Sequence, residues 1–261
     1  MNLSDVANLP AIPSSAEAIE RKRGFREEVA IALDGQLASD PCVEAVEAGL
    51  RGVNHYHSPA NPPYWRSIPG SIPQLWLRRS VAERLMRVNA RVEDLGVELF
   101  LFDAWRPASV QAYFHDVWFP EWLQQRRPDL QGDALMREVE MYWSAPSAGE
   151  ASPAPHATGA AVDLTLVLRS TGHPLFMGGL FDDVTENAWT DAFERAAPAS
   201  MSDEEARRNR RILYWAMSEE GFANNPTEWW HYSWGDQMWA RLTGADAAHF
   251  GECVPEQTDR A

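Results

Sequence analysis

Two apolar segments of strand length constrain the fold most strongly, because together they require a buried sheet. Residues 97–105 read VELFLFDAW, and residues 160–168 read AAVDLTLVL. Both have the length and apolar content of buried strands. The second segment is interrupted by a single charge, Asp163. The sequence therefore predicts a buried sheet that contains one carboxylate.

Helical patterns and loops alternate with these strands. Apolar residues recur at helical spacing in four segments: 80–96, from about 109 onward, 133–143 and 202–221. In the last of these, Ser202 and Glu205 match a capping box, and Gly221 is typical of a helix C-terminus. The irregular order of helices and strands favours an α+β fold over a parallel βαβ series.

Two further segments have no periodicity. Residues 54–65, NHYHSPANPPYW, contain three prolines and form either a linker or a loop shaped around a site. Residues 144–155 are rich in Ser, Ala and Pro, and they are also predicted to be a loop. Residues 1–50 are predicted to be a polar, partly helical N-terminal extension, followed by one domain over 51–261.

Composition excludes several classes of partner. The chain has 261 residues, 23 basic and 38 acidic, with a net charge of −15. Nucleic acids and anionic membranes need clustered Lys and Arg, so neither is expected as a partner. No secretory signal and no apolar run of membrane-spanning length is visible, so we expect a cytoplasmic protein. Two cysteines make neither a disulfide framework nor a Cys-only zinc site.

The segment 226–234, PTEWWHYSW, places Glu228 and His231 on either side of two tryptophans. His156 stands just before the strand that contains Asp163. A carboxylate in a buried strand is costly unless it is paired or bound to a cation. His156, Asp163 and His231 would together suit a four-coordinate Zn²⁺ with one open position. Glu228 would then be a non-ligand carboxylate, able to take a proton from water at that site.

Structural explanations remain open for each of these residues taken alone. A single histidine is more often hydrogen-bonded at the surface or in the core than bound to a metal. Asp163 alone is also compatible with an acid that caps nearby backbone. His156 and His231 are 75 residues apart in sequence, and spacing does not link them.

Three motifs in order resemble the zinc D-alanyl-D-alanine dipeptidases, which are related to D,D-carboxypeptidases and hedgehog-like domains. HATGAAVDLTL resembles the His-x-x-Gly-x-Ala-x-Asp signature of that family, EWWHY its Glu-x-x-His signature, and FDAWRP its Asp-x-x-Arg-Pro segment. The resemblance covers roughly residues 75–235. It implies a central antiparallel sheet flanked by helices, within a zinc dipeptidase-like catalytic domain over 51–261.

The resemblance also implies roles for individual residues. His156, Asp163 and His231 would bind Zn²⁺, and Glu228 would be the general base. Arg106 would donate hydrogen bonds to the oxyanion, a role that suits a bidentate charge on a turn stiffened by proline. Asp103 would orient Arg106 or remain a surface turn acid. Tyr56 and Trp230 are expected to contact the substrate. No organic cofactor is implied.

The expected substrate is a small dipeptide, D-Ala-D-Ala by default. The family usually has a serine at the position of Ala154, where it helps to hold the substrate ammonium. We therefore expect weaker turnover of D-Ala-D-Ala and a preference for a bulkier or modified dipeptide, with Tyr56, Tyr64 and Trp65 near the entrance. A replacement acceptor would come from Asp182, Asp183, Glu186 or the 54–65 loop.

Two alternative functions stay open. One is another peptidase of the same clan, such as a D,D-carboxypeptidase or an enzyme acting on a peptide natural product. The other is a non-catalytic zinc-binding module that recognises peptides. A module without activity would be free to lose its base and oxyanion donor. Because Glu228 and Arg106 are both present, the sequence favours catalysis.

Overall fold

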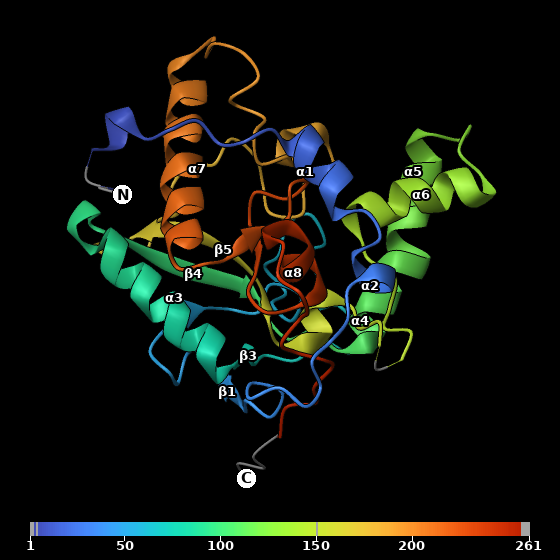
Figure 1. Ribbon diagram of the computed structural model, residues 1–261. Coiled ribbons are helices and arrows are strands. Elements are labelled where there is room, and N and C mark those ends of the chain that lie inside the picture. The colour runs from blue at the N-terminus through green and yellow to red at the C-terminus, as the bar shows by residue number, and fades with distance from the viewer. Residues whose placement is uncertain (1–2, 4, 150, 257–261) are drawn as a thin grey trace.

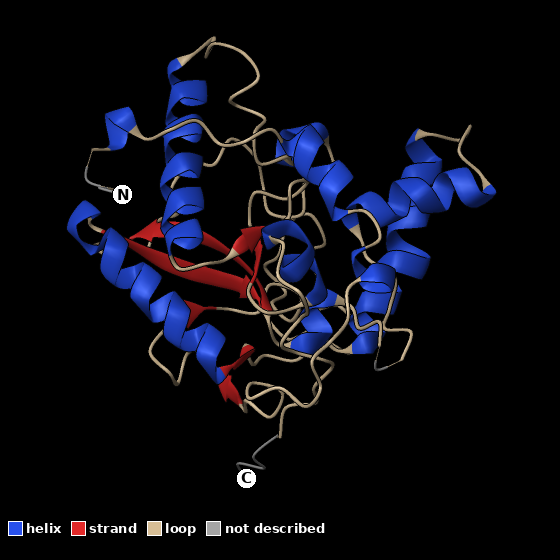
Figure 2. Ribbon diagram, viewed as in Figure 1, coloured by secondary structure: helices blue, strands red, loops and turns tan. Residues whose placement is uncertain are grey.

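A five-stranded sheet lies at the centre of the protein (Figure 2). The computed structural model describes residues 3, 5–149 and 151–256. The strands, in spatial order, are β2 (Arg51–Gly52), β4 (Val97–Asp103), β5 (Ala161–Leu168), β7 (His231–Ser233) and β6 (Ala223–Asn224). The mixed α/β character is confirmed. The sheet is antiparallel except at one edge, where β2 runs parallel to β4.

Both predicted strands are confirmed, and burial explains their composition. Along β4, buried and partly buried residues alternate, as expected for a strand with one better covered face. Strand β5 lies between β4 and β7 and is buried at every position except its last, Leu168. It therefore reads as a continuous apolar run. Asp163 is a charged residue that is 2% exposed within this apolar strand.

Helices α3 (Arg79–Val92) and α7 (Met201–Glu219) pack against each other beside strands β4 and β5 (Figure 1). The start of α7 differs from the prediction. Its N-cap is Ser200, whose Oγ accepts a hydrogen bond from the Asp203 backbone N–H at 3.1 Å. The Asp203 carboxylate in turn accepts from the Ala199 N–H. The N-cap thus lies two residues earlier than Ser202, at an overlapping Ser-x-x-acid pattern whose acid accepts from the N–H before the N-cap residue.

The remaining helices lie mainly on the other side of the molecule (Figure 1). The helix predicted from residue 109 begins as α4 (Ala108–Ala112), passes through a π-helical stretch over Tyr113–Trp118 and continues as α5 (Phe119–Arg126). The predicted helix over 133–143 is α6 (Gly132–Tyr142). A short helix near the C-terminus, α8 (Gln237–Thr243), was not predicted. The predicted loops 54–65 and 144–155 contain no strand among their described residues, which leave out residue 150. The 3-10 turn that holds His156 begins at the end of the second loop.

Residues 3 and 5–50 form a segment that wraps around the rest of the protein (Figure 1). It contains α1 (Ser15–Lys22), α2 (Phe25–Glu28) and β1 (Cys42–Glu44). Strand β1 pairs with β3 (Trp76–Arg78). Several apolar side chains of this segment belong to the same hydrophobic core as the sheet: Leu3, Leu9, Ala45 and Leu50. The domain boundary at residue 50 stays a prediction.

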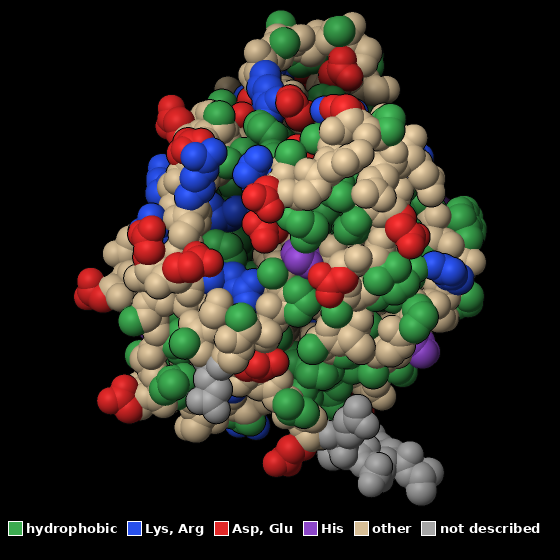
Figure 3. Space-filling model, turned by 90° about the vertical axis from the view of Figure 1, so that its right-hand side faces the viewer, with side chains coloured by type: hydrophobic (Ala, Val, Ile, Leu, Met, Phe, Trp, Pro, Cys, Tyr) green, Lys and Arg blue, Asp and Glu red, His purple; other side chains and the backbone are tan. Residues whose placement is uncertain are grey.

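Two cysteines that are distant in sequence meet in the fold. The Sγ atoms of Cys42 and Cys253 are 3.3 Å apart, and both thiols are free. Within the described part of the chain, no helix has both the length and the apolar character needed to cross a membrane. Acidic side chains are spread over the face shown in Figure 3 rather than gathered into one patch.

Candidate metal centre

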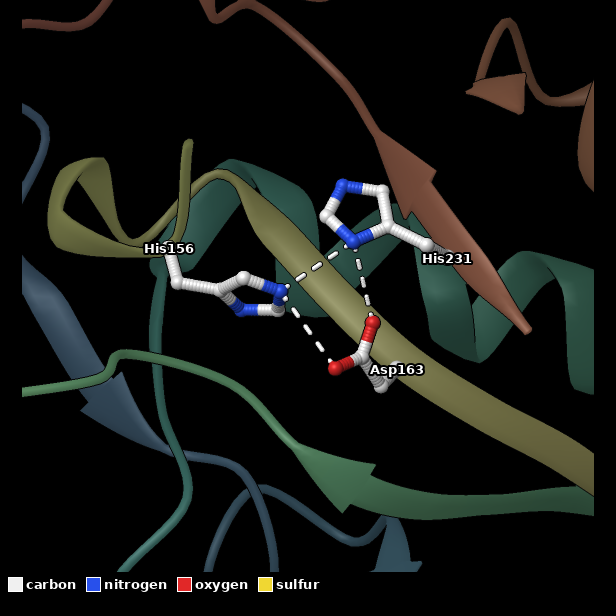
Figure 4. A group of neighbouring side chains, drawn as sticks. All are labelled: His156, Asp163 and His231. Carbon is white, nitrogen blue, oxygen red and sulfur yellow. Dashed lines mark hydrogen bonds and ion pairs between the residues drawn. The ribbon is translucent and has the colours of Figure 1, made fainter. Parts of the chain in front are cut away.

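Three buried side chains converge from β5, β7 and the turn that precedes β5 (Figure 4). His231 Nδ1 is 3.0 Å from Asp163 Oδ1, and His156 Nε2 is 3.4 Å from Asp163 Oδ2. The two imidazole nitrogens, His156 Nε2 and His231 Nδ1, are 3.1 Å apart. The structure thus brings together the three residues that the sequence named as metal ligands.

The sheet and one glycine turn create this convergence. Asp163 and His231 are direct partners in the antiparallel register of β5 and β7, so their side chains project from the same face. His156 lies in the 3-10 turn Pro155–Thr158, which ends at Gly159 with φ of +68°. A Cβ at Gly159 would lie 3.2 Å from the Cys253 sulfur, in a backbone conformation that favours glycine. This turn returns the chain into β5 directly beneath His156.

Hydrogen bonds outside the cluster orient the two imidazoles. His156 Nδ1 is 2.7 Å from the Ala104 carbonyl oxygen, which can only accept, so Nδ1 carries the proton. The lone pair of His156 Nε2 then faces the cluster. His231 Nε2 lies 3.4 Å from the Ser233 hydroxyl, which leaves Nδ1 directed at the same point. A second hydrogen bond of this kind is typical of metal-binding histidines.

The donor set fits a cation. Two imidazole lone pairs and a carboxylate face one another, and they would repel without a positive charge between them. Asp163 Oδ1 is buried, and its neighbour His231 Nδ1, at 3.0 Å, presents a lone pair to it and donates no hydrogen bond. Burial raises the pKa of Asp163, but positive charge on His156 and His231 more than offsets this and holds the pKa far below its usual range. A bound cation would supply that positive charge in place of protonated imidazoles. Two histidines and one carboxylate suit Zn²⁺ with a position left open.

Glu228 lies beside this group without belonging to it. Its Oε2 is 3.6 Å from His231 Nδ1. Glu228 lies in a turn over residues 225–231 that is fixed at both ends. The Glu228 N–H donates to the Asn225 carbonyl, and the Glu228 carbonyl accepts from the His231 N–H. Asn224 Nδ2 also donates to the Glu228 carbonyl at 3.0 Å. Burial raises the pKa of the Glu228 carboxyl above its ordinary value.

Arg106 approaches from the end of β4 and is held by several acceptors. Its Nε donates to Asp103 Oδ2 and its Nη1 to Gln111 Oε1, each at 2.8 Å. Its Nη2 donates to Asp163 Oδ2 at 3.1 Å. Asp103 is 1% exposed, so the alternative that it is an acid in a surface turn is wrong. Nη2 of the guanidinium therefore lies next to the candidate ligands.

A pocket of about 540 Å³, including its part open to solvent, contains this centre. The predicted site residues that line it are Tyr56, Arg106, His156, Asp163, Glu228, Trp230 and His231. Asp103 lies behind Arg106 instead of lining the pocket. The lining also includes Lys22, Gln111 and Asn225, which the sequence analysis did not identify. The available signal for Lys22 was that it is the only lysine in the chain.

Asp182 adds another carboxylate to the pocket, besides those of Asp163 and Glu228. Tyr56 OH donates to its Oδ1 at 3.2 Å, and Tyr64 OH donates to its Oδ2 at 2.8 Å. Burial and the nearby Asp163 raise the pKa of Asp182 well above its ordinary value. Asp183 also lines the pocket. Among the acceptors considered from sequence, Glu186 is instead largely exposed and pairs with Arg195.

Ala154 and Trp65 do not line the pocket. Ala154 is buried, and its N–H donates to the Ser147 hydroxyl. Trp65 is 70% exposed. Of the three aromatic residues expected near the entrance, Tyr56 lines the pocket and Tyr64 reaches it through its hydrogen bond to Asp182.

Comparison with known proteins identifies similar sequences. The profile of the D-ala-D-ala dipeptidase family, peptidase family M15, matches residues 73–249. A D-alanyl-D-alanine dipeptidase of Synechocystis sp. is 35% identical over 178 residues, which cover 63% of this chain and 71% of that protein. The enzyme of the same name from Enterococcus faecalis is 30% identical over 159 residues, covering 61% of this chain and 73% of that one.

A solved structure, VanYB in complex with D-Alanine-D-Alanine, aligns over 65% of this chain and 79% of its own, with 14% identity and a TM-score of 0.36. The family assignment rests instead on the sequence match, which spans more than half of the chain and contains Arg106 and all of the candidate ligands. The chain is therefore an enzyme of the D-ala-D-ala dipeptidase family, peptidase family M15 of the metallopeptidases.

Proposed function

We propose that this protein is a zinc-dependent dipeptidase whose default substrate is D-Ala-D-Ala. One observation supports the proposal above all. Glu228 and Arg106, a carboxylate with a raised pKa and a buried guanidinium, both lie beside the His156, Asp163 and His231 group in one pocket. Cytoplasmic localisation and the expectation of no nucleic-acid or membrane partner stay predictions.

His156, Asp163 and His231 would hold the metal. Zn²⁺ bound there supplies Lewis acidity, which polarises a peptide carbonyl and makes water more acidic. The protein contributes the fixed orientation of the ligands. The Ala104 carbonyl holds the tautomer of His156, and the strand register holds Asp163 and His231 opposite each other.

Glu228 would act as the general base and then as the general acid. A base is most effective when its pKa lies near the working pH, and burial moves the pKa of Glu228 upward in that direction. Its carboxylate would accept a proton from the attacking water and pass it to the leaving amine. The 225–231 turn keeps the carboxylate in place through its backbone hydrogen bonds.

Arg106 would stabilise the negative charge that develops on the carbonyl oxygen. Asp103 and Gln111 hold two of its guanidinium nitrogens. Nη2 faces the ligand group and would donate to the oxyanion with little reorganisation, which is the condition for effective electrostatic stabilisation. Asp103 would thus be a positioning residue for Arg106.

Asp182 would bind the substrate ammonium. A strict dipeptidase must recognise this group, since it separates a dipeptide from the end of a longer chain. A buried ammonium needs an acceptor or a carboxylate. Asp182, with Tyr56 and Tyr64 on its two oxygens, offers a carboxylate in the pocket where Ala154 offers no hydroxyl. Trp230 would supply apolar contact.

A panel of D,D-, L,D- and L,L-dipeptides tests this function. We expect the zinc-loaded protein to release free amino acid from D-Ala-D-Ala faster than from the L,L isomer. Release from a longer peptide with a D-Ala-D-Ala end, but not from the dipeptide, would favour the D,D-carboxypeptidase alternative. No release from any member, despite full zinc loading, would favour the non-catalytic module.

A further inference from the structure

The N-terminal segment contributes a cation to the active-site pocket. Lys22, the last residue of α1 and the only lysine in the chain, lines the pocket together with Arg106, Glu228 and His231. Its Nζ donates to Asn225 Oδ1 at 2.8 Å. The family profile begins at residue 73, so Lys22 lies outside the part of the chain that the family match covers.

Several contacts fix the segment that carries Lys22. The Arg26 guanidinium donates to the carbonyl oxygens of Ala145, Pro146 and Ser152, in the loop that leads to His156. Gln237 Nε2, in α8, donates to the carbonyl oxygens of Arg26 and Val29. The loop before His156 and helix α8 after His231 therefore both hold the N-terminal segment against the pocket.

The proposed role of Glu228 indicates which group of the substrate lies near Lys22. In a dipeptide, the leaving nitrogen and the terminal carboxylate are bonded to the same α-carbon. A base that protonates the leaving nitrogen must therefore have the carboxylate close by. Lys22 is positioned for that carboxylate, because it lines the same pocket as Glu228 and both residues bond to Asn225. Burial lowers the pKa of the Lys22 ammonium, and the Glu228 carboxylate opposes that shift.

We propose that Lys22 binds the terminal carboxylate of the dipeptide, an inference that rests on the proposed dipeptidase function. The substrate then lies between two charges of opposite sign, with its ammonium at Asp182 and its carboxylate at Lys22. Asp182 is held by Tyr56 and Tyr64, and Lys22 by Asn225. The N-terminal segment is in this way part of the substrate-binding site.

The same side chain would limit substrate length. A second and wider groove, lined by residues of α1, α2 and α6, lies next to the pocket, and Lys22 and Ser144 line both cavities. Lys22 thus stands at the boundary between them. A substrate extended beyond its second residue would lose the ion pair and would have to displace Lys22 to enter the groove.

The test compares D-Ala-D-Ala with D-Ala-D-alaninamide, which lacks the negative charge, in the zinc-loaded protein and in Lys22→Met. A hydrogen bond to a charged group accounts for about 10- to 100-fold in binding. We expect Lys22→Met to raise KM for the acid by this factor, to change kcat much less and to leave the amide nearly unaffected. Lys22→Arg should restore much of the preference. The matched control is Arg23→Met, which removes an exposed cation from the next position.

Two results would overturn the proposal. Equal losses for the acid and the amide would mean that Lys22 acts through Glu228 or through folding. An unchanged KM for the acid would mean that Lys22 does not contact the substrate. The melting temperature of each variant separates loss of folding from loss of binding.

A binding experiment separates this proposal from the dipeptidase function. Calorimetry of zinc-loaded Glu228→Gln, with and without Lys22→Met, measures the affinity for the acid and the amide in the absence of turnover. Preference for the acid that depends on Lys22, combined with no hydrolysis of either compound by the zinc-loaded natural protein, would support the role of Lys22 and contradict the dipeptidase function. Hydrolysis by the natural protein without a Lys22-dependent preference for the acid would support the dipeptidase function and contradict the role of Lys22. If the protein neither binds nor hydrolyses these compounds, both the role of Lys22 and the dipeptidase function are contradicted.

Discussion

Asp163 and His231 lie directly opposite each other on β5 and β7, with Asp163 Oδ1 3.0 Å from His231 Nδ1. The antiparallel register alone brings these two side chains to the same face, although 67 residues of chain separate them. Their relationship would be lost by a shift of one residue in either strand, because alternate residues of a strand face opposite sides. Two of the three candidate ligands are thus placed by the sheet itself, and the turn before β5 adds His156.

The ligand assignment predicts metal content. We expect about one Zn²⁺ per chain in the natural protein and loss of that zinc in the double variant His156→Ala, His231→Ala. Elemental analysis after gel filtration measures the ratio. His173→Ala, in a turn after β5, serves as the control histidine and should retain the metal. Full zinc occupancy in the double variant would disprove the ligand set.

Arg106→Ala should lower kcat by about 10²- to 10³-fold, because an oxyanion donor contributes on that order. Zinc content should be unchanged, since Arg106 contacts Asp163 without being a ligand itself. The control is Arg127→Ala, which removes an exposed guanidinium that is paired with Asp129. A rise in KM at constant kcat would mean that Arg106 binds the substrate in its ground state instead.

Asp182 predicts a pH dependence of substrate binding. Its carboxyl has a pKa raised by burial, so it becomes protonated at a higher pH than an ordinary aspartate. Only the ionised form attracts an ammonium, and KM for D-Ala-D-Ala should therefore rise as the pH falls through this raised pKa. Asp182→Asn should have a high KM without that rise. Asp183→Asn, the neighbouring carboxylate in the pocket, is the control.

A KM that stays constant across the acidic range in the natural protein would contradict the role of Asp182. The same conclusion would follow if Asp182→Asn and Asp183→Asn behaved alike. Initial rates at several substrate concentrations, measured at each pH, separate KM from kcat and thereby separate Asp182 from Glu228.

Ala154→Ser tests the expectation that alanine at this position weakens turnover of D-Ala-D-Ala. Ala154 is buried outside the pocket lining, and Asp182 already supplies an acceptor. We therefore expect kcat/KM for D-Ala-D-Ala to change little in the Ser variant. A large gain in kcat/KM would show that the missing hydroxyl limits recognition, as the sequence first suggested.

The sequence predicted the elements whose local pattern is strong. The apolar runs of β4 and β5 and the periodic segments of α3 and α7 were identified from their own residues. The parallel pairing of β2 was not, because a strand of two residues carries too little pattern. The start of α7 was misplaced because Ser200 and Ser202 each stand three residues before an acid, and the sequence pattern does not distinguish them.

The site residues that lie within short sequence motifs could be predicted from the sequence. His156, Asp163, Glu228 and His231 fall within two motifs, and the structure brings them together. Lys22 could not be placed in the same way. Its position depends on how the N-terminal segment packs against α8 and the 144–155 loop, and these long-range contacts leave no local signature.

The most direct test of the central claim is turnover of D-Ala-D-Ala by the natural protein and by Glu228→Gln at equal, measured zinc content. Glu228 is close to the ligands without being one, so the variant should keep its zinc. We predict that its kcat falls by about 10²- to 10⁴-fold, the usual contribution of a positioned acid–base group. Loss of zinc from the variant, or a kcat equal to that of the natural protein, would contradict the assignment of Glu228 as the general base of a zinc dipeptidase.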